Sequence, residues 1–368
     1  MSHDQDTQPR HTSAQAESEP LFSIIIPVFN RPDEVDELLD SLTRQQERDF
    51  EVVVVEDGSQ TPCLSVCDKY QGRLRLRYFA KPNSGPGQSR NYGVERANGR
   101  YMLILDSDVV LPEGYLTAIK HELRREPADA FGGPDRAHHS FSDTQKAISY
   151  AMTSFFTTGG IRGGKKKLDK FYPRSFNMGV RRDVYQQLGG FSKMRFGEDI
   201  DFSIRIFKAG YQCRLFPDAW VYHKRRTDFR KFWRQVYNSG IARINLFKRY
   251  PDSLKAVHLL PMIFTLGTIA LTLFALLGAV IFLFGHTPTQ HSFGVTAMTI
   301  GLLPLVLYAI LIFADAAIFF SSAKIGLLAI RAAFTQLMGY GCGFIGAAWK
   351  RLIWHKDEYS AYNHNFYK

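Results

Sequence analysis

The sequence has little cysteine. Only 4 of the 368 residues are cysteines, scattered at Cys63, Cys67, Cys213 and Cys342. So few and such widely spaced cysteines exclude a disulfide framework and fit a reducing compartment. Cys63 and Cys67 lack paired histidine or cysteine partners at the spacing of zinc ligands, so no zinc site is expected.

Charge is missing from a long stretch of the C-terminal third. Between Val257 and Ala323 the only charged residue is Asp315. The whole chain has a net charge of +11, from 46 Lys and Arg against 35 Asp and Glu. This uneven distribution excludes a single soluble globule. The positive charge predicts an anionic partner, which could be a nucleic acid, an anionic lipid or a phosphorylated substrate.

The beginning of the sequence has no apolar run of the kind found in signal peptides. Residues 1–20 are mostly polar, so we predict a disordered tail there and no secretory signal. The region that follows is therefore expected to stay in the cytoplasm.

Short runs rich in β-branched residues alternate with helical patterns in the first third of the chain. The runs are Phe22–Phe29, Phe50–Glu56, Leu74–Ala80 and Tyr101–Asp106. Near-continuous apolar strands are typical of a parallel sheet that is buried on both faces. The sequence therefore predicts an α/β domain over residues 21–245, with a mostly parallel open sheet.

Ligands of such sheets bind at the carboxyl ends of the strands, so the residues there are the candidates for chemistry. These positions hold the acid Asp57, a glycine-rich helix start that includes Arg90, and the sequence Asp106-Ser107-Asp108. Arg90 stands where a dinucleotide-binding fingerprint would have its third glycine, so dinucleotide binding is disfavoured. A glycine-rich helix start with an arginine still suits a diphosphate. Asp57 could bind a nucleobase or ribose, or could cap a turn.

Asp106 and Asp108 are spaced so that both side chains leave the same face of an extended segment. Two nearby carboxylates repel unless a cation lies between them, and their hard oxygen atoms suit Mg²⁺ or Mn²⁺. The alternative is a pair of solvated turn residues, but the position after a buried strand favours a metal site. His223 follows another apolar run and is a candidate third ligand, although a lone histidine is usually structural.

Glu198 and Asp199 begin a predicted helix. Acids at a helix N terminus stabilise the helix dipole in any protein, so this position alone does not indicate catalysis. A general base requires one carboxylate beside an acceptor hydroxyl, and either residue could serve.

Two apolar spans, 257–284 and 293–320, each exceed the ~20 residues that cross a bilayer. The connector 285–292 has no Lys or Arg, whereas basic residues crowd both outer flanks. The positive-inside rule therefore predicts a transmembrane helical hairpin with both ends cytoplasmic. A third stretch, 325–349, is less apolar. If it crossed the membrane, the lysines near the C terminus would lie on the side opposite the cytoplasm. We interpret it as an interfacial or re-entrant helix.

A basic, aromatic run over residues 223–249 precedes this membrane region, which covers residues 257–368. The run could bind nucleic acid, but its position beside a span favours anionic membrane lipids, and no nucleic-acid partner is expected. Residues 246–256 are expected to form a basic juxtamembrane linker.

Six motifs in order resemble the family-2 glycosyltransferases with the GT-A (Rossmann-like) fold. They lie between Leu21 and Ile244 and read SIIIPVFN, VVVVEDGS, NSGPGQSRNYG, LILDSD, SFNMGVRRDVYQQLGGF and GEDIDF. The sequence departs from the family pattern at Glu56, where aspartate is usual, and after Gln235, where the Q-x-x-R-W signature of processive synthases is missing. The missing signature and the two clear spans argue against a polymer-extruding synthase.

The resemblance implies a role for each matching residue. Contacts to the nucleotide sugar would come from Pro27, Val28, Phe29, Asn30, Asp57, Arg90, Asp106 and Ser107. The divalent metal would be held by Asp106 and Asp108, with His223 completing the site as in some relatives. Asp199 would be the catalytic base, with Glu198 beside it near the acceptor.

The sequence thus predicts an inverting, metal-dependent glycosyltransferase at the cytoplasmic face of a membrane, such as a bacterial inner membrane. The acceptor hydroxyl is expected on a lipid-linked compound or a glycan. One alternative is a synthase that glycosylates a polyprenyl phosphate, but the insert Phe131–Phe176 favours a larger hydroxylated acceptor. The other is a non-catalytic, membrane-tethered protein that binds nucleotide sugars. A transporter is disfavoured because Asp315 is the only charge in either clear span.

Overall fold

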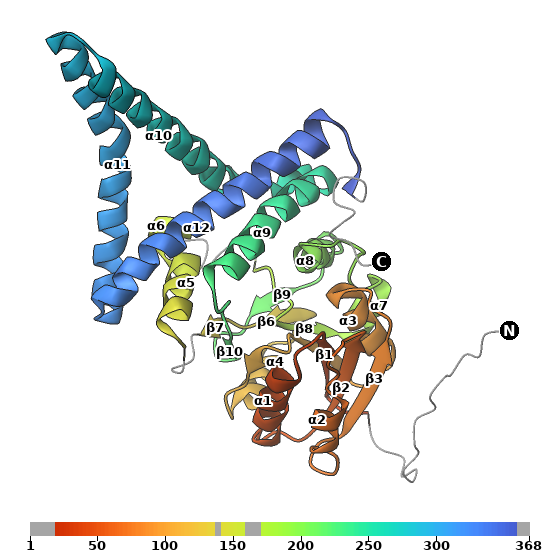
Figure 1. Ribbon diagram of the computed structural model, residues 1–368. Helices are drawn as coiled ribbons and strands as arrows, with labels where there is room; N and C mark the ends of the chain where they lie inside the picture. Colours follow the sequence, from red (N-terminus) through yellow and green to blue (C-terminus); the bar gives the residue numbers. More distant parts are fainter. Residues whose placement is uncertain (1–18, 137–140, 159–170, 359–368) are drawn as a thin grey trace.

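The computed structural model describes residues 19–136, 141–158 and 171–358. Most of the predicted disordered tail lies outside the described residues, as does the lysine-rich part of the predicted acceptor insert. Figure 1 shows two parts, a sheet domain and a group of long helices stacked against one side of it.

The sheet domain is built on seven strands in the order β3-β2-β1-β4-β8-β6-β9. Strand β1 pairs in parallel with both β2 and β4, and β2 pairs in parallel with β3, whereas β8 runs antiparallel to β4 and β6. The predicted mostly parallel sheet is confirmed. The strands are β1 (Phe22–Val28), β2 (Phe50–Asp57), β3 (Leu76–Lys81), β4 (Tyr101–Leu105), β6 (Ala130–Gly132), β8 (Asn177–Arg181) and β9 (Cys213–Leu215).

Helices cover both faces of the sheet, which explains why the strands have no polar face. In β1, Ile24 and Ile26 pack into one apolar cluster and Ile25 into another on the opposite face. The first cluster includes residues of α1 (Pro32–Thr43), α2 (Leu64–Asp68) and α4 (Tyr115–Arg125). The second includes residues of α3 (Pro86–Glu95), α7 (Arg182–Gln187) and α8 (Glu198–Lys208).

A second, three-stranded sheet brings distant parts of the chain to the end of β4. Its strands are β5 (Val109–Val110), β10 (Val221–His223) and β7 (Asp135–Arg136). Strand β10 runs antiparallel to β5, and His223 lies opposite Val109. This pairing places His223 beside Asp108, although 115 positions separate them in the sequence.

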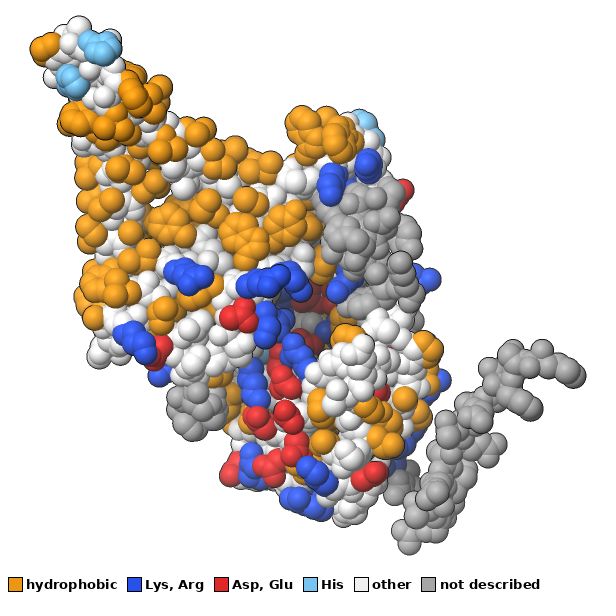
Figure 2. Space-filling view, viewed as in Figure 1, with side chains coloured by type: hydrophobic (Ala, Val, Ile, Leu, Met, Phe, Trp, Pro, Cys, Tyr) orange, Lys and Arg blue, Asp and Glu red, His pale blue; other side chains and the backbone are white. Residues whose placement is uncertain are grey.

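Three helices are long and apolar enough to cross a membrane: α10 (Leu260–Phe284), α11 (Pro288–Phe320) and α12 (Ala323–Ala348). Helix α11 begins five residues before the predicted span because the Thr287 side chain caps it. Helices α10 and α11 form a hairpin, and α12 runs from the end of α11 past the start of α10 and alongside α9 (Figure 1). Apolar side chains cover the surface of the hairpin (Figure 2). The candidate span that contains α12 is less apolar than the other two. Its mean hydropathy is 1.2, compared with 2.5 for the span that contains α10 and 2.4 for the span that contains α11.

The connection to the hairpin is short and partly helical. Helix α9 (Phe229–Arg249) is followed by the 3-10 turns η1 (Pro251–Ser253) and η2 (Ala256–Leu259). The predicted domain boundary at residue 245 therefore falls inside α9. After α12 the chain continues as a π-helical turn, η3 (Trp349–Ile353).

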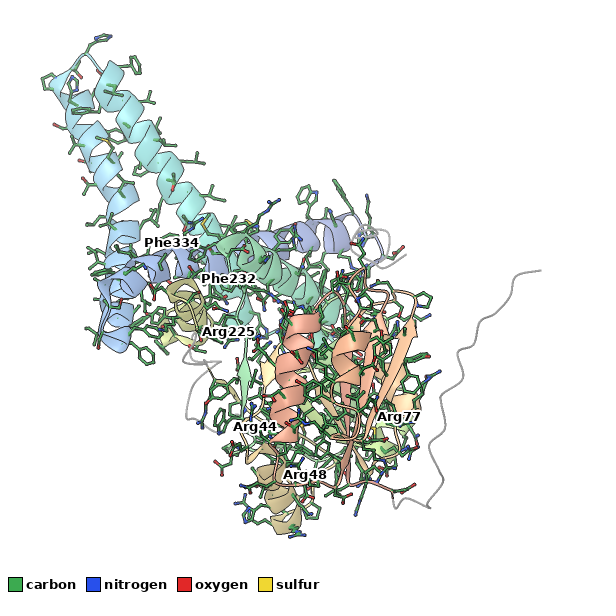
Figure 3. All side chains as sticks on the ribbon, turned by 60° about the horizontal axis from the view of Figure 1, so that its bottom comes forward. Arg44, Arg48, Arg77, Arg225, Phe232 and Phe334 are labelled. Carbon is green, nitrogen blue, oxygen red and sulfur yellow. The ribbon has the colours of Figure 1, made fainter. Side chains whose placement is uncertain are left out.

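Helices α9 and α12 connect the two parts of the molecule. Figure 3 shows Phe232 of α9 and Phe334 of α12 within the helical layer, and Arg225 where this layer meets the sheet domain. The two helices touch backbone to backbone, since a Cβ atom at Gly343 would lie 2.0 Å from the carbonyl oxygen of Tyr237. Helices α5 (Asp143–Thr153) and α6 (Phe155–Thr158) pack against the same layer.

Replacing Gly343 with alanine is expected to destabilise the protein by about 1–3 kcal/mol, because the added methyl group forces α9 and α12 apart. Thermal unfolding of the detergent-solubilised protein would measure the loss. Gly267→Ala is the matched control, because a Cβ atom there meets nothing within 4 Å. Equal melting temperatures for the two variants would contradict the tight contact.

Candidate active site

Three potential metal ligands meet at the end of β4. Asp106, Asp108 and His223 each offer a ligand atom, and these atoms lie within 4.8 Å of one another. Asp108 Oδ1 lies 3.2 Å from His223 Nε2 and is buried without a hydrogen bond from the described residues. Two carboxylates and an imidazole suit Mg²⁺ or Mn²⁺. Ser107, between the two acids, is buried.

Two arginines that the sequence analysis did not select surround the second of these acids. Arg31 Nη1 lies 2.6 Å from Asp108 Oδ2, and Arg226 Nη1 lies 3.7 Å from the same atom. Burial favours the neutral carboxyl, but His223 and the two guanidinium groups outweigh it and hold the pKa of Asp108 well below its usual range. Asp108 is therefore ionised at any physiological pH. Arg31 could have been suspected from its place after the first strand.

Arg90 lies between the metal group and the helix that carries the candidate base. Its Nη2 atom is 2.8 Å from Asp106 and its Nη1 atom is 2.9 Å from Glu198. The guanidinium is buried and packs 5.1 Å from the centre of the Phe191 ring. Arg90 is thus at the site, but its side chain contacts carboxylates, and its predicted contact with the donor stays a prediction.

The predicted acid pair begins α8, after Gly197 in a left-handed conformation with φ of 85°. Asp199 Oδ2 lies 2.6 Å from Arg174 Nε, a third arginine that the sequence analysis did not select. Burial opposes ionisation of Asp199, but Arg174 outweighs it and lowers the pKa of Asp199. Burial and the neighbouring charge of Asp199 instead raise the pKa of Glu198, in spite of Arg90. The two acids therefore differ in proton affinity, and Asp199 loses its proton at the lower pH of the two.

The predicted nucleotide side of the site is formed by loops after β1 and β2. Asp57 accepts backbone hydrogen bonds from Ser84 and Gly85, at 2.9 and 2.8 Å, so its carboxylate fixes the start of the glycine-rich segment. Asn30 has a positive φ of 54°, and its Oδ1 accepts a hydrogen bond from the backbone of Gln60. These bonds hold the loops in place.

The remaining predicted donor contacts belong to β1 and its end. Pro27 and Val28 lie in the strand, and the Phe29 side chain is 48% exposed. Their predicted role in holding a nucleotide stays a prediction. Glu56, the departure from the family pattern, is buried and accepts a hydrogen bond of 2.7 Å from the backbone of Cys63.

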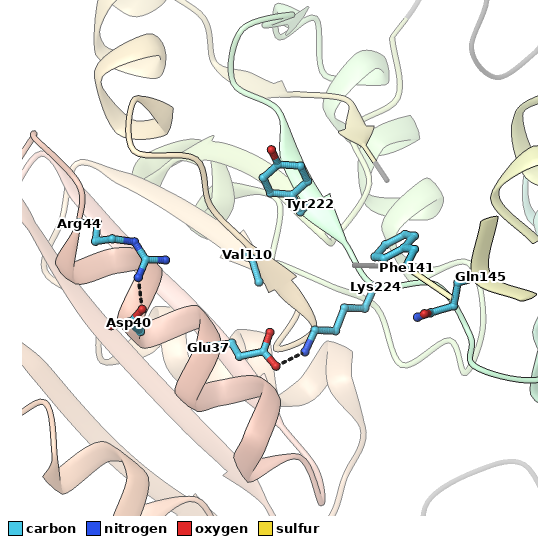
Figure 4. Close-up of a pocket in the computed structure, with 8 residues that line it drawn as sticks. All are labelled: Glu37, Asp40, Arg44, Val110, Phe141, Gln145, Tyr222 and Lys224. Carbon is cyan, nitrogen blue, oxygen red and sulfur yellow. Dashed lines mark hydrogen bonds and ion pairs between the residues drawn. The ribbon is translucent and has the colours of Figure 1, made fainter. Parts of the chain in front are cut away.

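A separate cavity of about 460 Å³ lies between α1, the small sheet and α5 (Figure 4). Tyr222 and Lys224, on either side of His223 in the sequence, line it. The charged groups that line it are paired, Glu37 with Lys224 at 2.6 Å and Asp40 with Arg44. Because none of the predicted site residues lines it, we do not assign the cavity to the active site.

Residues 23–189 match the family described as Glycosyl transferase family 2. This part of the chain belongs to that family. For the matched residues the predicted class, a glycosyltransferase, is confirmed, and most of the motifs that carried the resemblance lie among them. The GEDIDF motif and His223 lie beyond them.

Several glycosyltransferases are similar to part of this chain. The uncharacterized glycosyltransferase EpsJ of Bacillus subtilis (strain 168) is 31% identical over 209 residues, 54% of this chain and 60% of EpsJ. An uncharacterized glycosyltransferase of Rickettsia felis is 32% identical over 138 residues, 37% of this chain and 22% of that protein. The chain therefore spans about a fifth of the length of this Rickettsia relative. The poly(ribitol-phosphate) beta-N-acetylglucosaminyltransferase TarS of Staphylococcus aureus (strain Mu50) is 38% identical over 91 residues, 24% of this chain and 16% of TarS.

A solved structure confirms the predicted GT-A fold of the glycosyltransferase. The mannosyltransferase PcManGT from Pyrobaculum calidifontis, in complex with GDP-Man and Mn²⁺, superimposes with a TM-score of 0.53. The alignment covers 94% of this chain and 92% of that one, at 18% sequence identity. At this identity the likeness establishes the fold alone.

Proposed function

We propose that this glycosyltransferase moves a sugar from a nucleotide sugar to an acceptor hydroxyl, with inversion at the anomeric carbon and with Mg²⁺ or Mn²⁺. One observation carries the proposal: a single buried arginine, Arg90, joins a metal-ligand group at Asp106 to the acid pair at Glu198. A donor diphosphate bound at the metal-ligand group and an acceptor hydroxyl bound at the acid pair would then lie close enough to react.

Asp106, Asp108 and His223 would hold the metal ion. When bound, the ion supplies Lewis-acid neutralisation of the diphosphate leaving group. Arg31 and Arg226, which lie on Asp108, add fixed positive charge beside the place where that negative charge develops.

Asp199 would take the proton of the acceptor hydroxyl. Its low pKa keeps it ionised, and the hydrogen bond of 2.8 Å from the Ile200 backbone to Oδ1 fixes the carboxylate. A single base that activates an attacking hydroxyl supports direct displacement, and direct displacement inverts the anomeric centre. Glu198, with its raised pKa, would stay beside the acceptor and hold Arg90 in position.

The membrane helices support a lipid-linked acceptor or a membrane-bound glycan. The three long apolar helices indicate membrane association, and we place the catalytic domain on the cytoplasmic face because basic residues flank the hairpin. The basic run before it would contact anionic lipids. We also propose that α12 lies along the membrane–water interface. In its most apolar 18-residue segment 44% is buried inside the protein, compared with 17% and 11% in the corresponding segments of the first and second candidate spans.

The decisive experiment follows nucleotide release by the detergent-solubilised protein with a panel of nucleotide sugars. Each donor is tested with Mn²⁺, Mg²⁺ or chelator, and with a membrane lipid extract as acceptor. Metal-dependent release that needs both one donor and the extract supports the proposal. Tight binding of a donor without release under any condition favours the non-catalytic binding protein. Purified polyprenyl phosphate as a sufficient acceptor favours the polyprenyl-phosphate synthase.

Replacing Arg174 with glutamine is expected to move the acidic limb of the pH–rate profile to higher pH. Asp199 has a depressed pKa because of Arg174, and its base function is lost as pH falls through that pKa. Without the guanidinium the pKa of Asp199 rises, so activity is lost earlier on acidification. Arg174→Lys, which keeps the charge, should keep most of the original profile. If the parent and Arg174→Gln have superimposable pH–rate profiles, Asp199 is not the catalytic base.

A further inference from the structure

We infer that α6 and the end of α5, residues 147–158 in the middle of the glycosyltransferase domain, are embedded among the acyl chains of the membrane beside α11. The stretch contains no charged residue, and it lies far upstream of the membrane region predicted from the sequence. The inference rests on the candidate membrane helices and is independent of the proposed chemistry.

The apolar side chains of α5 form one cluster with the membrane helices. Ile148, Ala151 and Met152 are buried together with Ile312 of α11 and Ala329 of α12. The α5 helix is therefore packed into the helical layer on the side of α11 and α12. In Figure 1, α5 and α6 lie beside these two helices and apart from the central sheet.

Two hydrogen bonds fix the height of this stretch along α11. Tyr150 donates from its hydroxyl to Asp315 at 2.5 Å, and Tyr308 donates to the backbone carbonyl of Phe156 at 3.2 Å. Asp315 lies 5 residues before the end of α11 at Phe320, and Tyr308 lies 12 residues before it. At ~1.5 Å per residue these contacts are about 7 and 18 Å from that end.

These heights place α6 inside the hydrocarbon. Helix α11 has 33 residues and is about 50 Å long, so a core of ~30 Å centred on it leaves about 10 Å at each end. The Tyr150–Asp315 contact then lies at the headgroup level, which suits a carboxylate. The Phe156 carbonyl lies about 8 Å within the core, beside the apolar surface of α11.

The side chains of α6 match that environment. Phe155 is 70% exposed and Phe156 is 39% exposed, and α11 also carries exposed apolar side chains, such as Ile310. Threonine hydroxyls of the stretch donate to nearby backbone carbonyls. Thr153 donates to the carbonyl of Ser149 at 2.9 Å, and Thr158 donates to that of Ser154 at 2.8 Å. Hydroxyls and carbonyls satisfied by protein partners are what a site without water requires. Exposed phenylalanines beside a membrane helix are stabilised by lipid and are unfavourable in water.

A nitroxide spin label at position 155 tests the inference in full-length protein in nanodiscs. The parent for labelling carries Cys213→Ser and Cys342→Ala, because the other two cysteines are buried. The label is introduced by Phe155→Cys, and EPR measures its collisions with oxygen, which partitions into lipid, and with a water-soluble nickel chelate. Ile310→Cys on α11 is the lipid-facing control, and Leu64→Cys on α2 is the water-facing control, both at exposed positions.

The inference requires that the label at 155 behave as the label at 310 does, with high oxygen access and low nickel access. Nickel access equal to that at position 64 would overturn it, since α6 would then be in water. Low access to both reagents would also overturn it, because the label would be buried against protein. Phe156→Cys provides a second position if the Phe155→Cys protein does not fold.

Discussion

Replacing Asp108 with asparagine is expected to reduce sugar transfer by about 10²–10³-fold, the size of the loss when one preorganised electrostatic contact is removed from a transition state. Asp108 is the acid on which His223, Arg31 and Arg226 converge, so the substitution removes a metal ligand and leaves the two guanidinium groups without their common partner. Nucleotide release at saturating donor measures the loss, and EPR titration of Mn²⁺ measures the metal affinity separately.

The matched control is Asp33→Asn, which removes the charge of an exposed carboxylate in the first turn of α1. It should leave transfer and Mn²⁺ affinity unchanged. If Asp108→Asn binds Mn²⁺ as tightly as the parent, the assignment of Asp108 as a metal ligand is wrong. If it binds Mn²⁺ weakly but transfers at the full rate, the reaction does not depend on that ion.

Replacing Asp199 with asparagine is expected to lower kcat by about 10²–10⁴-fold while donor affinity stays within a factor of two to three, because general-base catalysis contributes about that much. The amide keeps the size of the side chain and removes its ability to take the acceptor proton. Single-turnover transfer gives the rate, and calorimetric titration with the donor gives the affinity.

Asp201→Asn is the control on the same helix. Asp201 is buried and holds Arg205 at 3.0 Å and the Tyr250 hydroxyl at 3.0 Å, so it ties α8 to the end of α9. We expect this variant to melt at a lower temperature and to keep the transfer rate per folded molecule. A normal kcat for Asp199→Asn would leave Glu198 as the remaining candidate for the base.

The central strands were predictable because each carries its own signal. Apolar, β-branched runs such as the one in β2 are buried along their entire length, and such burial on both faces occurs only where helices cover the sheet. The positions of Asp106 and Asp108 followed directly, since the residues after a parallel strand lie at the ligand-binding edge.

The partners of the acids were less accessible to sequence reasoning. His223 reaches Asp108 only because β10 pairs with the two-residue strand β5, and a pairing across so many residues leaves no local pattern. Arg174 lies in a loop before β8 with no helical or strand periodicity, and only the structure places it on Asp199. The membrane hairpin was predicted from composition, whereas the packing of α5 on α11 and α12 was not, because its uncharged stretch is too short to span a bilayer.

The position of Arg90 has a genetic consequence. Because one guanidinium is shared between Asp106 and Glu198, a substitution at either acid changes the electrostatic surroundings of the other. Single substitutions across the site are therefore expected to show strong epistasis: their effects on ΔG‡ will not sum, and the second loss will cost less than the first. Natural variation should obey the same rule, with these three positions changing together or not at all.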